Sequence, residues 1–99
     1  MEYFFEWDPK KARENIQTHK VSFQRAATIF RDSCMISIFD DEHSVTEERW
    51  ISIGIDEKGV LQIVSHTFQM IDRFRCSIRI ISSRKASKNE IKQYKELNR

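Results

Sequence analysis

One stretch decides the fold expected for this chain: Arg79-Ile-Ile-Ser-Ser-Arg-Lys-Ala-Ser-Lys-Asn-Glu90. Its alternating start is typical of a strand, and Ser87 with Glu90 has the S-x-x-E spacing of a capping box, so a helix should begin there. Three cations stand around this junction: Arg79, Arg84 and Lys85. A strand that passes through a cationic turn into a capped helix is a good place to hold a phosphate.

The two faces of this strand should differ, because side chains along a strand alternate with period two. One face is expected to carry Ile78, Ile80 and Ser82, and the other Arg79, Ile81 and Ser83. Arg79 should therefore point away from the face that holds the two buried isoleucines.

The composition fits one small domain that spans residues 1–99. Of these residues 39% are hydrophobic and 32% are charged, and two glycines and one proline leave no visible linker. No apolar run reaches the roughly 18 residues that cross a membrane, and the N-terminus lacks the pattern of a signal peptide, so we expect a cytoplasmic protein without membrane contact. Cys34 and Cys76 have no close partner that would indicate a disulfide framework or a zinc motif. We expect no metal and no cofactor.

The charge is distributed unevenly along the chain, although its total is only +2. Residues 1–49 carry 7 Lys/Arg and 10 Asp/Glu, whereas residues 50–99 carry 10 and 5, so the halves are −3 and +5. A basic half of this size can attract a polyanion, but by itself it does not predict nucleic-acid binding.

The hydrophobic pattern predicts an α+β fold. Asp8-Pro9 is an N-cap followed by proline at the first helical position, and Ser22 can cap a second helix with apolar residues at i, i+3, i+4 and i+7. The expected order is a strand over 3–7, helices over 9–19 and 23–30, strands over 35–39, 49–55, 61–68 and 76–83, and a helix over 87–97. We expect an antiparallel sheet of about four strands after the short N-terminal one, with the helices on one side.

Several ordered motifs together resemble a known family. They are Phe5-Glu-Trp-Asp-Pro-Lys-Lys-Ala12, Asn15, His19, Val21-Ser-Phe23, Ala26-Ala27, Phe30, Glu48-Arg-Trp50, Gly54, His66-Thr67 and Arg79-Ile-Ile-Ser-Ser-Arg-Lys-Ala86. This set resembles the BrnT family of bacterial type II toxins. The resemblance implies a RelE-like fold, a metal-independent ribonuclease that arrests translation, and a BrnA-type antitoxin partner. That antitoxin carries a ribbon-helix-helix region, so operator DNA would be bound only through it.

Two segments depart from the family pattern. Where the family usually has Lys-His-Gly, this chain has Thr18-His19-Lys20, so either Lys20 ends the helix without the freedom of glycine at positive φ or the turn differs. The connection over residues 67–76 is longer and more apolar than the short turn expected there. Such a tip can contact a partner, extend the sheet or hold substrate, and we favour partner contact.

Metal-free cleavage of RNA requires a base, cations for the developing negative charge, and a proton for the leaving oxygen. Arg79 and Arg84 suit the second role, since a guanidinium stays charged and donates paired hydrogen bonds to phosphate oxygens. A surface ion pair is the alternative for each of them.

Two histidines are candidates because imidazole titrates near neutral pH. We expect His19 to act in catalysis, although at the end of a helix it can instead cap the last carbonyl groups. For His66 we expect a role in substrate binding, with a buried structural role as the alternative because it shares a strand face with Val64 and Phe68.

The remaining candidates come from three places in the chain. Lys11 matches the lysine of the family's first helix and is expected in catalysis, with an exposed salt bridge as the alternative. Arg49 is expected to bind the reacting phosphate, while Glu48 accepts a proton and Trp50 stacks on a base, or is part of the core. Lys85 is expected to bind substrate.

Two functions from different classes remain open. The first is an active endoribonuclease toxin. The second is a catalytically impaired protein of the same fold that acts only as an antitoxin-binding or corepressor module, because of the changes at Thr18, Lys20 and residues 67–76. Clustering of Arg79, Arg84 and a histidine in one open pocket would favour the first.

Overall fold

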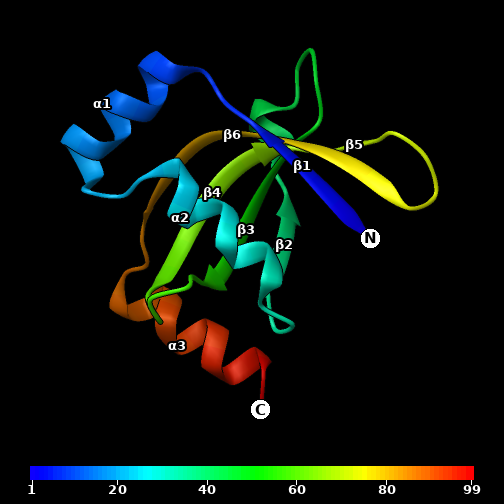
Figure 1. The fold of residues 1–99 in the computed structure, drawn as a ribbon. Helices are drawn as coiled ribbons and strands as arrows, with labels where there is room; N and C mark the ends of the chain where they lie inside the picture. The colour runs from blue at the N-terminus through cyan, green and yellow to red at the C-terminus, as the bar shows by residue number, and fades with distance from the viewer.

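The longest strand, β6 (Arg75–Lys85), organises the sheet of the computed structural model, which describes residues 1–99. The strand order is β1-β6-β4-β3-β2, and the short β5 also pairs with β6 (Figure 1). The other elements are β1 (Glu2–Glu6), α1 (Pro9–His19), α2 (Phe23–Ala27), the 3₁₀ turn η1 (Thr28–Arg31), β2 (Ile36–Phe39), the 3₁₀ turn η2 (Asp41–His43), β3 (Arg49–Ile55), β4 (Leu61–Thr67), β5 (Gln69–Met70) and α3 (Lys88–Leu97). The predicted α+β fold is confirmed.

The sheet is mixed rather than antiparallel throughout. Strands β2, β3, β4 and β6 are antiparallel neighbours, as predicted, but β1 runs parallel to β6 from Glu2 opposite Arg75 to Glu6 opposite Arg79. Parallel neighbours need a long connection, and the whole chain between these two strands supplies it. The alternation of residues within a strand does not reveal the direction of its partner.

The predicted helix starts are confirmed in their hydrogen bonds. The Asp8 side chain accepts from the Lys10 N–H at 2.8 Å, and the Ser22 hydroxyl accepts from the Arg25 N–H at 3.1 Å. Both bonds of the Ser87–Glu90 capping box are present. The second helix is shorter than predicted, because after Ala27 the chain tightens into η1.

Lys20 ends α1 in the left-handed region, with φ of 60°, and donates its N–H to the Ile16 carbonyl at 3.0 Å. The turn that glycine would normally make is therefore kept by a lysine, at a cost of roughly 1 kcal/mol.

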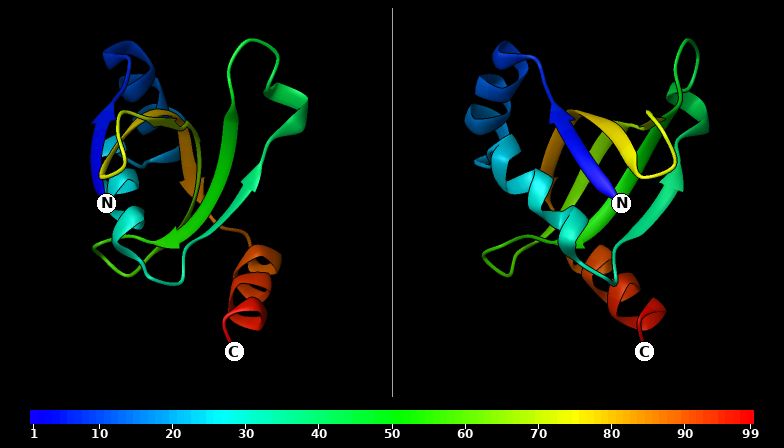
Figure 2. Two further views of the ribbon diagram at one scale, coloured as in Figure 1. Left: turned by 90° about the vertical axis from the view of Figure 1, so that its right-hand side faces the viewer. Right: turned by 45° about the vertical axis from the view of Figure 1, so that its right-hand side comes forward.

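A cluster of buried side chains lies between α2 with η1 and one face of the sheet, here called the core face: Phe23, Ala26, Ile29, Val64, Cys76, Ile78 and Ile80. The sheet curls around it, as Figure 2 shows. The opposite face is called the outer face. α3 lies beyond one end of the sheet instead of joining the other helices, so the helices are not all on one side (Figure 1). None of the helices has the length and apolar character needed to span a membrane.

The predicted faces of β6 are wrong for Ser82 and Ser83, because the strand contains a bulge. Ser82 pairs with Ser65 and Ile80 pairs with the next residue of β4, His66, so Ile81 is an extra residue. An extra residue inverts the alternation beyond it. Ser83 is therefore buried on the core face and Ser82 lies on the outer face, the reverse of the expectation. Arg84 consequently shares the outer face with Arg79.

The buried carboxylate of Asp56 links the β3–β4 hairpin to α2 through hydrogen bonds. The Asp56 Oδ2 accepts from Arg25 Nη2 at 2.7 Å, Arg25 Nε at 3.1 Å and Gln62 Nε2 at 2.6 Å, while its Oδ1 accepts from the Lys58 and Val60 N–H groups at 2.8 and 3.0 Å. Burial alone would raise the pKa of Asp56, but these hydrogen bonds lower it below its ordinary value. The ionised form is thus the one that the fold uses.

We expect Asp56→Asn to lower the free energy of unfolding by about 3 kcal/mol, because the amide turns an N–H group or a neutral oxygen toward the donors of Arg25 and Gln62. Urea denaturation at pH 7 measures it. Asp72→Asn is the matched control, since Asp72 forms a solvent-exposed pair with Arg75 at 2.6 Å, and its effect on the free energy of unfolding should be much smaller. Equal effects of the two substitutions would contradict the anchoring role of Asp56.

Candidate functional site

α1 lies along an edge of β6 that β1 leaves open. The pairing of β1 ends at Glu6 and Arg79, so the backbone of β6 beyond that point lacks a strand on this side. Asn15 takes the place of a strand there. Its Oδ1 accepts from the Ser83 N–H at 3.1 Å, and its Nδ2 donates to the Ser83 carbonyl at 2.9 Å and to the Val21 carbonyl at 3.0 Å. The helix is thereby fixed at one residue of β6.

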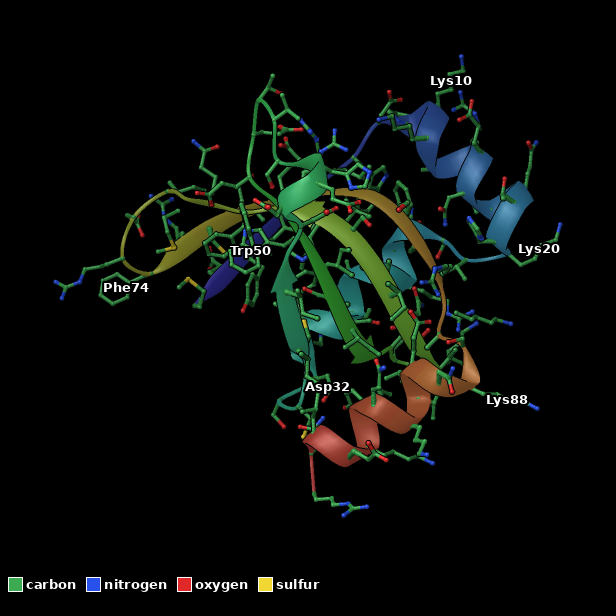
Figure 3. The ribbon with its side chains drawn as sticks, turned by 180° about the vertical axis from the view of Figure 1, so that it is seen from behind. Lys10, Lys20, Asp32, Trp50, Phe74 and Lys88 are labelled. Atoms are coloured by element: carbon green, nitrogen blue, oxygen red, sulfur yellow. The ribbon has the colours of Figure 1, made fainter.

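This contact directs two predicted residues to the same side as the arginines. Lys11, Asn15 and His19 are spaced by four and therefore share one face of α1. Lys11 lines a cavity with Arg79, and His19 lines a second cavity with Arg84. Figure 3 views the molecule from the side opposite to that of Figure 1, so the outer face is toward the reader. In this view α1 lies on one side, between the labelled Lys10 and Lys20, and α3 lies below.

The first group of charges is called the Arg79 cluster and consists of Lys11, Glu47, Arg49 and Arg79. The Arg79 guanidinium donates to the Glu47 Oε1, and Arg49 Nη2 lies 3.6 Å from the same oxygen. Their side chains are 33 to 41% exposed, so solvent reaches the group. The buried Arg49 Nε has no hydrogen-bond partner. Two guanidinium groups that meet at one carboxylate oxygen form a site for an oxyanion.

The second group is called the His19–Arg84 cavity and is lined by His19, Ser65, Ser82, Arg84, Glu90, Gln93 and isoleucines of the outer face. Its arginine is bound by two hydrogen bonds to Glu90, at 2.8 and 2.9 Å. Glu90 also accepts from the Ser87 N–H at 2.8 Å, so the ion pair is part of the start of α3. Arg84, above all, lowers the pKa of Glu90 to about 2. His19 is exposed.

Trp50 and His66 lie on the core face, away from the arginines. Trp50 packs edge-on against Phe39 with ring centroids 5.3 Å apart. His66 is 2% exposed, and its Nε2 lies 2.7 Å from the Ser52 Oγ while its Nδ1 lies 2.9 Å from the Thr67 carbonyl oxygen. Burial lowers the pKa of His66, so the neutral ring is favoured. The environment of His66 therefore matches the alternative given for it above, a buried structural role.

The remaining predicted residues are exposed: Glu48 in the loop before β3, and Lys85 at the end of β6. Neither forms an ion pair, so the Glu48 carboxylate is not paired with Arg49 or Arg79. Its neighbour Glu47 is paired with both, and the sequence analysis missed it. In Glu47-Glu48-Arg49 either carboxylate can reach a cation, and only the path of the loop decides between them. Tyr94 on α3 is buried and donates its hydroxyl to Asp32 at 2.5 Å, so it is a packing residue of the fold.

The structure divides the expected set of residues between two cavities. Arg84 and a histidine line one of them, whereas Arg79 lines the other with Lys11. The separation of eight positions between Lys11 and His19 corresponds to about 12 Å along a helix. Together the cavities form a basic strip along α1 and β6 instead of one pocket. His, Cys, Asp and Glu side chains form no group of three or more that could hold a metal ion.

Comparisons with known proteins agree with this fold. A family model described as ribonuclease toxin, BrnT, of type II toxin-antitoxin system matches residues 7–90. The crystal structure of the Brucella abortus ribonuclease toxin BrnT is similar to this chain with a TM-score of 0.63 and 18% sequence identity, over 89% of this chain and 100% of that one. No curated protein matches the sequence.

We expect the contribution of Glu90 to the free energy of unfolding to depend on pH. Because the pKa of Glu90 is about 2 in the folded chain, against an ordinary value of 4.5, its contribution is present above pH 4.5 and is lost as the pH falls toward 2. Glu90→Gln should be about 1 kcal/mol less stable than the wild type at pH 6, and this difference should vanish near pH 2. Urea titrations across this range measure it, with Glu96→Gln on the same helix as the control. A difference that does not vary with pH would contradict this role of Glu90.

Proposed function

Since the chain belongs to the BrnT family of ribonuclease toxins of type II toxin–antitoxin systems, we propose that it cleaves RNA without a metal ion, by attack of a ribose 2′-hydroxyl on the adjacent phosphate. The observation that carries this proposal is the Arg79 cluster, in which two guanidinium groups meet at one carboxylate oxygen. A carboxylate is a small planar oxyanion, so the position that Glu47 occupies suits a phosphate oxygen.

In this mechanism the scissile phosphate displaces the carboxylate of Glu47 from the arginines. Arg49 and Arg79 then donate hydrogen bonds to the non-bridging oxygens, whose negative charge grows as the 2′-oxygen attacks. Lys11 lines the same cavity as Arg79 and adds a third positive charge, which Asp8 in the same cavity partly offsets. The three cations stay charged throughout the reaction, so they stabilise the transition state without any transfer of protons.

The displaced carboxylate of Glu47 is the general base in this proposal. It takes the proton of the 2′-hydroxyl while the new bond to phosphorus forms, and the leaving 5′-oxygen takes up a proton from water. The products are a 2′,3′-cyclic phosphate and a 5′-hydroxyl. The role that the sequence suggested for Glu48 thus passes to the residue before it, which contacts the arginines.

The His19–Arg84 cavity binds a neighbouring part of the RNA backbone in this proposal, since it lies about 12 Å from Lys11 along α1. Arg84 is partly satisfied by Glu90, and the exposed His19 lines the same cavity, whereas Lys85 follows Arg84 in β6 and points to the other face. The charges of Arg84 and His19 would contribute to affinity rather than to the chemical step.

The protein partner that a type II system supplies is an antitoxin. We propose a BrnA-like antitoxin with a ribbon-helix-helix region, through which operator DNA is reached, and a complex that forms in the cytoplasm. Two observations favour the alternative of a catalytically impaired module: Arg79 and Arg84 line different cavities instead of one pocket, and both are held by carboxylates of the chain itself. Cleavage assays decide between the two.

We expect the purified chain to cleave protein-free RNA in excess EDTA and to leave 2′,3′-cyclic phosphate ends, identified by mass spectrometry. Arg79→Ala should lower kcat/KM by about 100-fold or more, because one stabilising charge is removed from the transition state. Arg13→Ala is the control, since Arg13 lies on α1 but off the face of Lys11 and His19. A folded chain without activity, on free RNA or on ribosomes, would favour the antitoxin-binding module.

Glu47→Gln should separate catalysis from binding. We expect kcat to fall by about 100-fold or more through loss of the base, while RNA binding stays equal or becomes tighter because a competing carboxylate is gone. Glu48→Gln should leave both quantities within about twofold. Single-turnover cleavage and RNA binding by fluorescence anisotropy measure the two effects. If Glu48→Gln abolishes cleavage and Glu47→Gln does not, the base is assigned to the wrong residue.

A further inference from the structure

A pocket opens on the core face, on the other side of the sheet from the arginines. Figure 2 shows that the sheet is curled, with β1 and β2 at its two edges. The pocket lies in the concave side of this sheet, with Tyr3 from one edge strand and Ser37 from the other among its lining residues. It has a volume of 280 Å³ and is lined by Tyr3, Phe30, Met35, Ser37, Trp50, His66 and Phe68. We call it the aromatic pocket. Its volume is near the lower end for small-molecule sites, and four of its seven lining residues are Phe, Tyr or Trp.

The polar groups of the pocket are ordered by a chain of hydrogen bonds. The Nδ1 of His66 lies 2.9 Å from the Thr67 carbonyl, so in the neutral ring this nitrogen carries the proton. Nε2 is then an acceptor, and the Ser52 hydroxyl, 2.7 Å away, must donate to it. Ser52 can therefore only accept from Ser37, whose oxygen lies 2.7 Å from its own. With its proton used, Ser37 offers only lone pairs to the pocket.

Trp50, in contrast to Ser37, carries a hydrogen-bond donor. Its indole N–H is buried without a hydrogen-bond partner. A buried donor without a partner is unfavourable, so an acceptor brought within its reach would stabilise it. The residues that line the pocket thus include Ser37, whose hydroxyl oxygen can accept a hydrogen bond, and Trp50, whose N–H lacks an acceptor. None of the lining residues is an acid, a lysine or an arginine.

We propose that the aromatic pocket binds a nucleobase. A base is flat enough to lie between aromatic rings, and its edge carries both hydrogen-bond donors and acceptors, whereas a phosphate or a carboxylate would find no cation here. The inference rests on the proposed function in that the base is one of the RNA substrate, adjacent to the phosphate held by the Arg79 cluster.

The position of Trp50 supports this link to the RNA. Arg49 and Trp50 are the first two residues of β3 and point to opposite faces, with Cα atoms about 3.8 Å apart. The loop over residues 40–48 leads into this end of β3, and the Asp40 N–H donates to the Arg49 carbonyl at 2.8 Å. In this proposal a nucleotide that reaches both Arg49 and Trp50 therefore lies beside this loop. Its phosphate then meets Arg49 while its base enters the pocket.

The test is nuclear magnetic resonance of the ¹⁵N-labelled chain, because the indole N–H signals of Trp7 and Trp50 report separately on the two rings. Titration with the four nucleoside 5′-monophosphates at millimolar concentration should shift the Trp50 signal saturably for at least one base. Ribose 5-phosphate, which lacks only the base, should leave it unchanged. Trp7, packed against Phe23 with ring centroids 6.0 Å apart, is the internal control.

Ser37→Ala and Trp50→Phe should each weaken the binding by about fivefold to tenfold, since each removes one hydrogen-bonding group and Trp50→Phe keeps an aromatic ring. For Trp50→Phe the backbone N–H signals of β3 report the binding. Arg79→Ala should keep the base-dependent shift of Trp50 even where it abolishes RNA cleavage.

The two proposals fail separately in this design. If the wild type cleaves RNA but no nucleotide shifts Trp50, or ribose 5-phosphate shifts it equally, the nucleobase pocket is wrong and the proposed function stands. If nucleotides bind with the expected dependence on Ser37 but RNA is not cleaved, the pocket stands and the proposed ribonuclease mechanism is wrong.

Discussion

The amide of Asn15 is the contact on which the proposed site depends. A strand edge without a neighbour leaves N–H and C=O groups unpaired, and burying them costs free energy. Asn15 satisfies both groups of Ser83 with one side chain, because a carboxamide carries a donor and an acceptor in the geometry of a peptide. The same contact sets the register of α1 on β6. Lys11 and His19, one turn before and one turn after, are thereby brought to Arg79 and Arg84.

The bulge at Ile81 is the second half of this arrangement. Without the extra residue Ser83 would turn to the outer face and Asn15 would lose its hydroxyl partner at 2.9 Å. Arg84 would turn to the core face, away from Arg79. One inserted residue therefore both buries the serine that fixes α1 and keeps two arginines on one surface. This is a long-range effect, since the bulge is defined only by how β6 pairs with β4.

That distinction explains which features the sequence could predict. The caps at Asp8, Ser22 and Ser87 depend on residues two or three positions apart, so the local pattern contains them. The parallel pairing of β1 and the inverted faces of Ser82 and Ser83 depend on partners far away in the chain. Asn15 belongs to a family motif, but its role follows only from Ser83, 68 residues later. Glu47 rather than Glu48 meets the arginines because of a loop whose path has no periodic signal.

The two arginine–carboxylate pairs differ in the free energy needed to open them, and in the proposed mechanism this difference determines which pair binds the reacting phosphate. Glu90 accepts from Arg84 and from the N–H that begins α3, so a phosphate that displaced it would also weaken the start of a helix. Glu47 lies in a loop, accepts a hydrogen bond only from the Arg79 side chain, and forms a longer ion pair with Arg49. A phosphate that displaces it replaces one oxyanion by another and disturbs no helix or strand. The Arg79 cluster can therefore exchange its internal carboxylate for substrate, whereas Arg84 chiefly stabilises the fold.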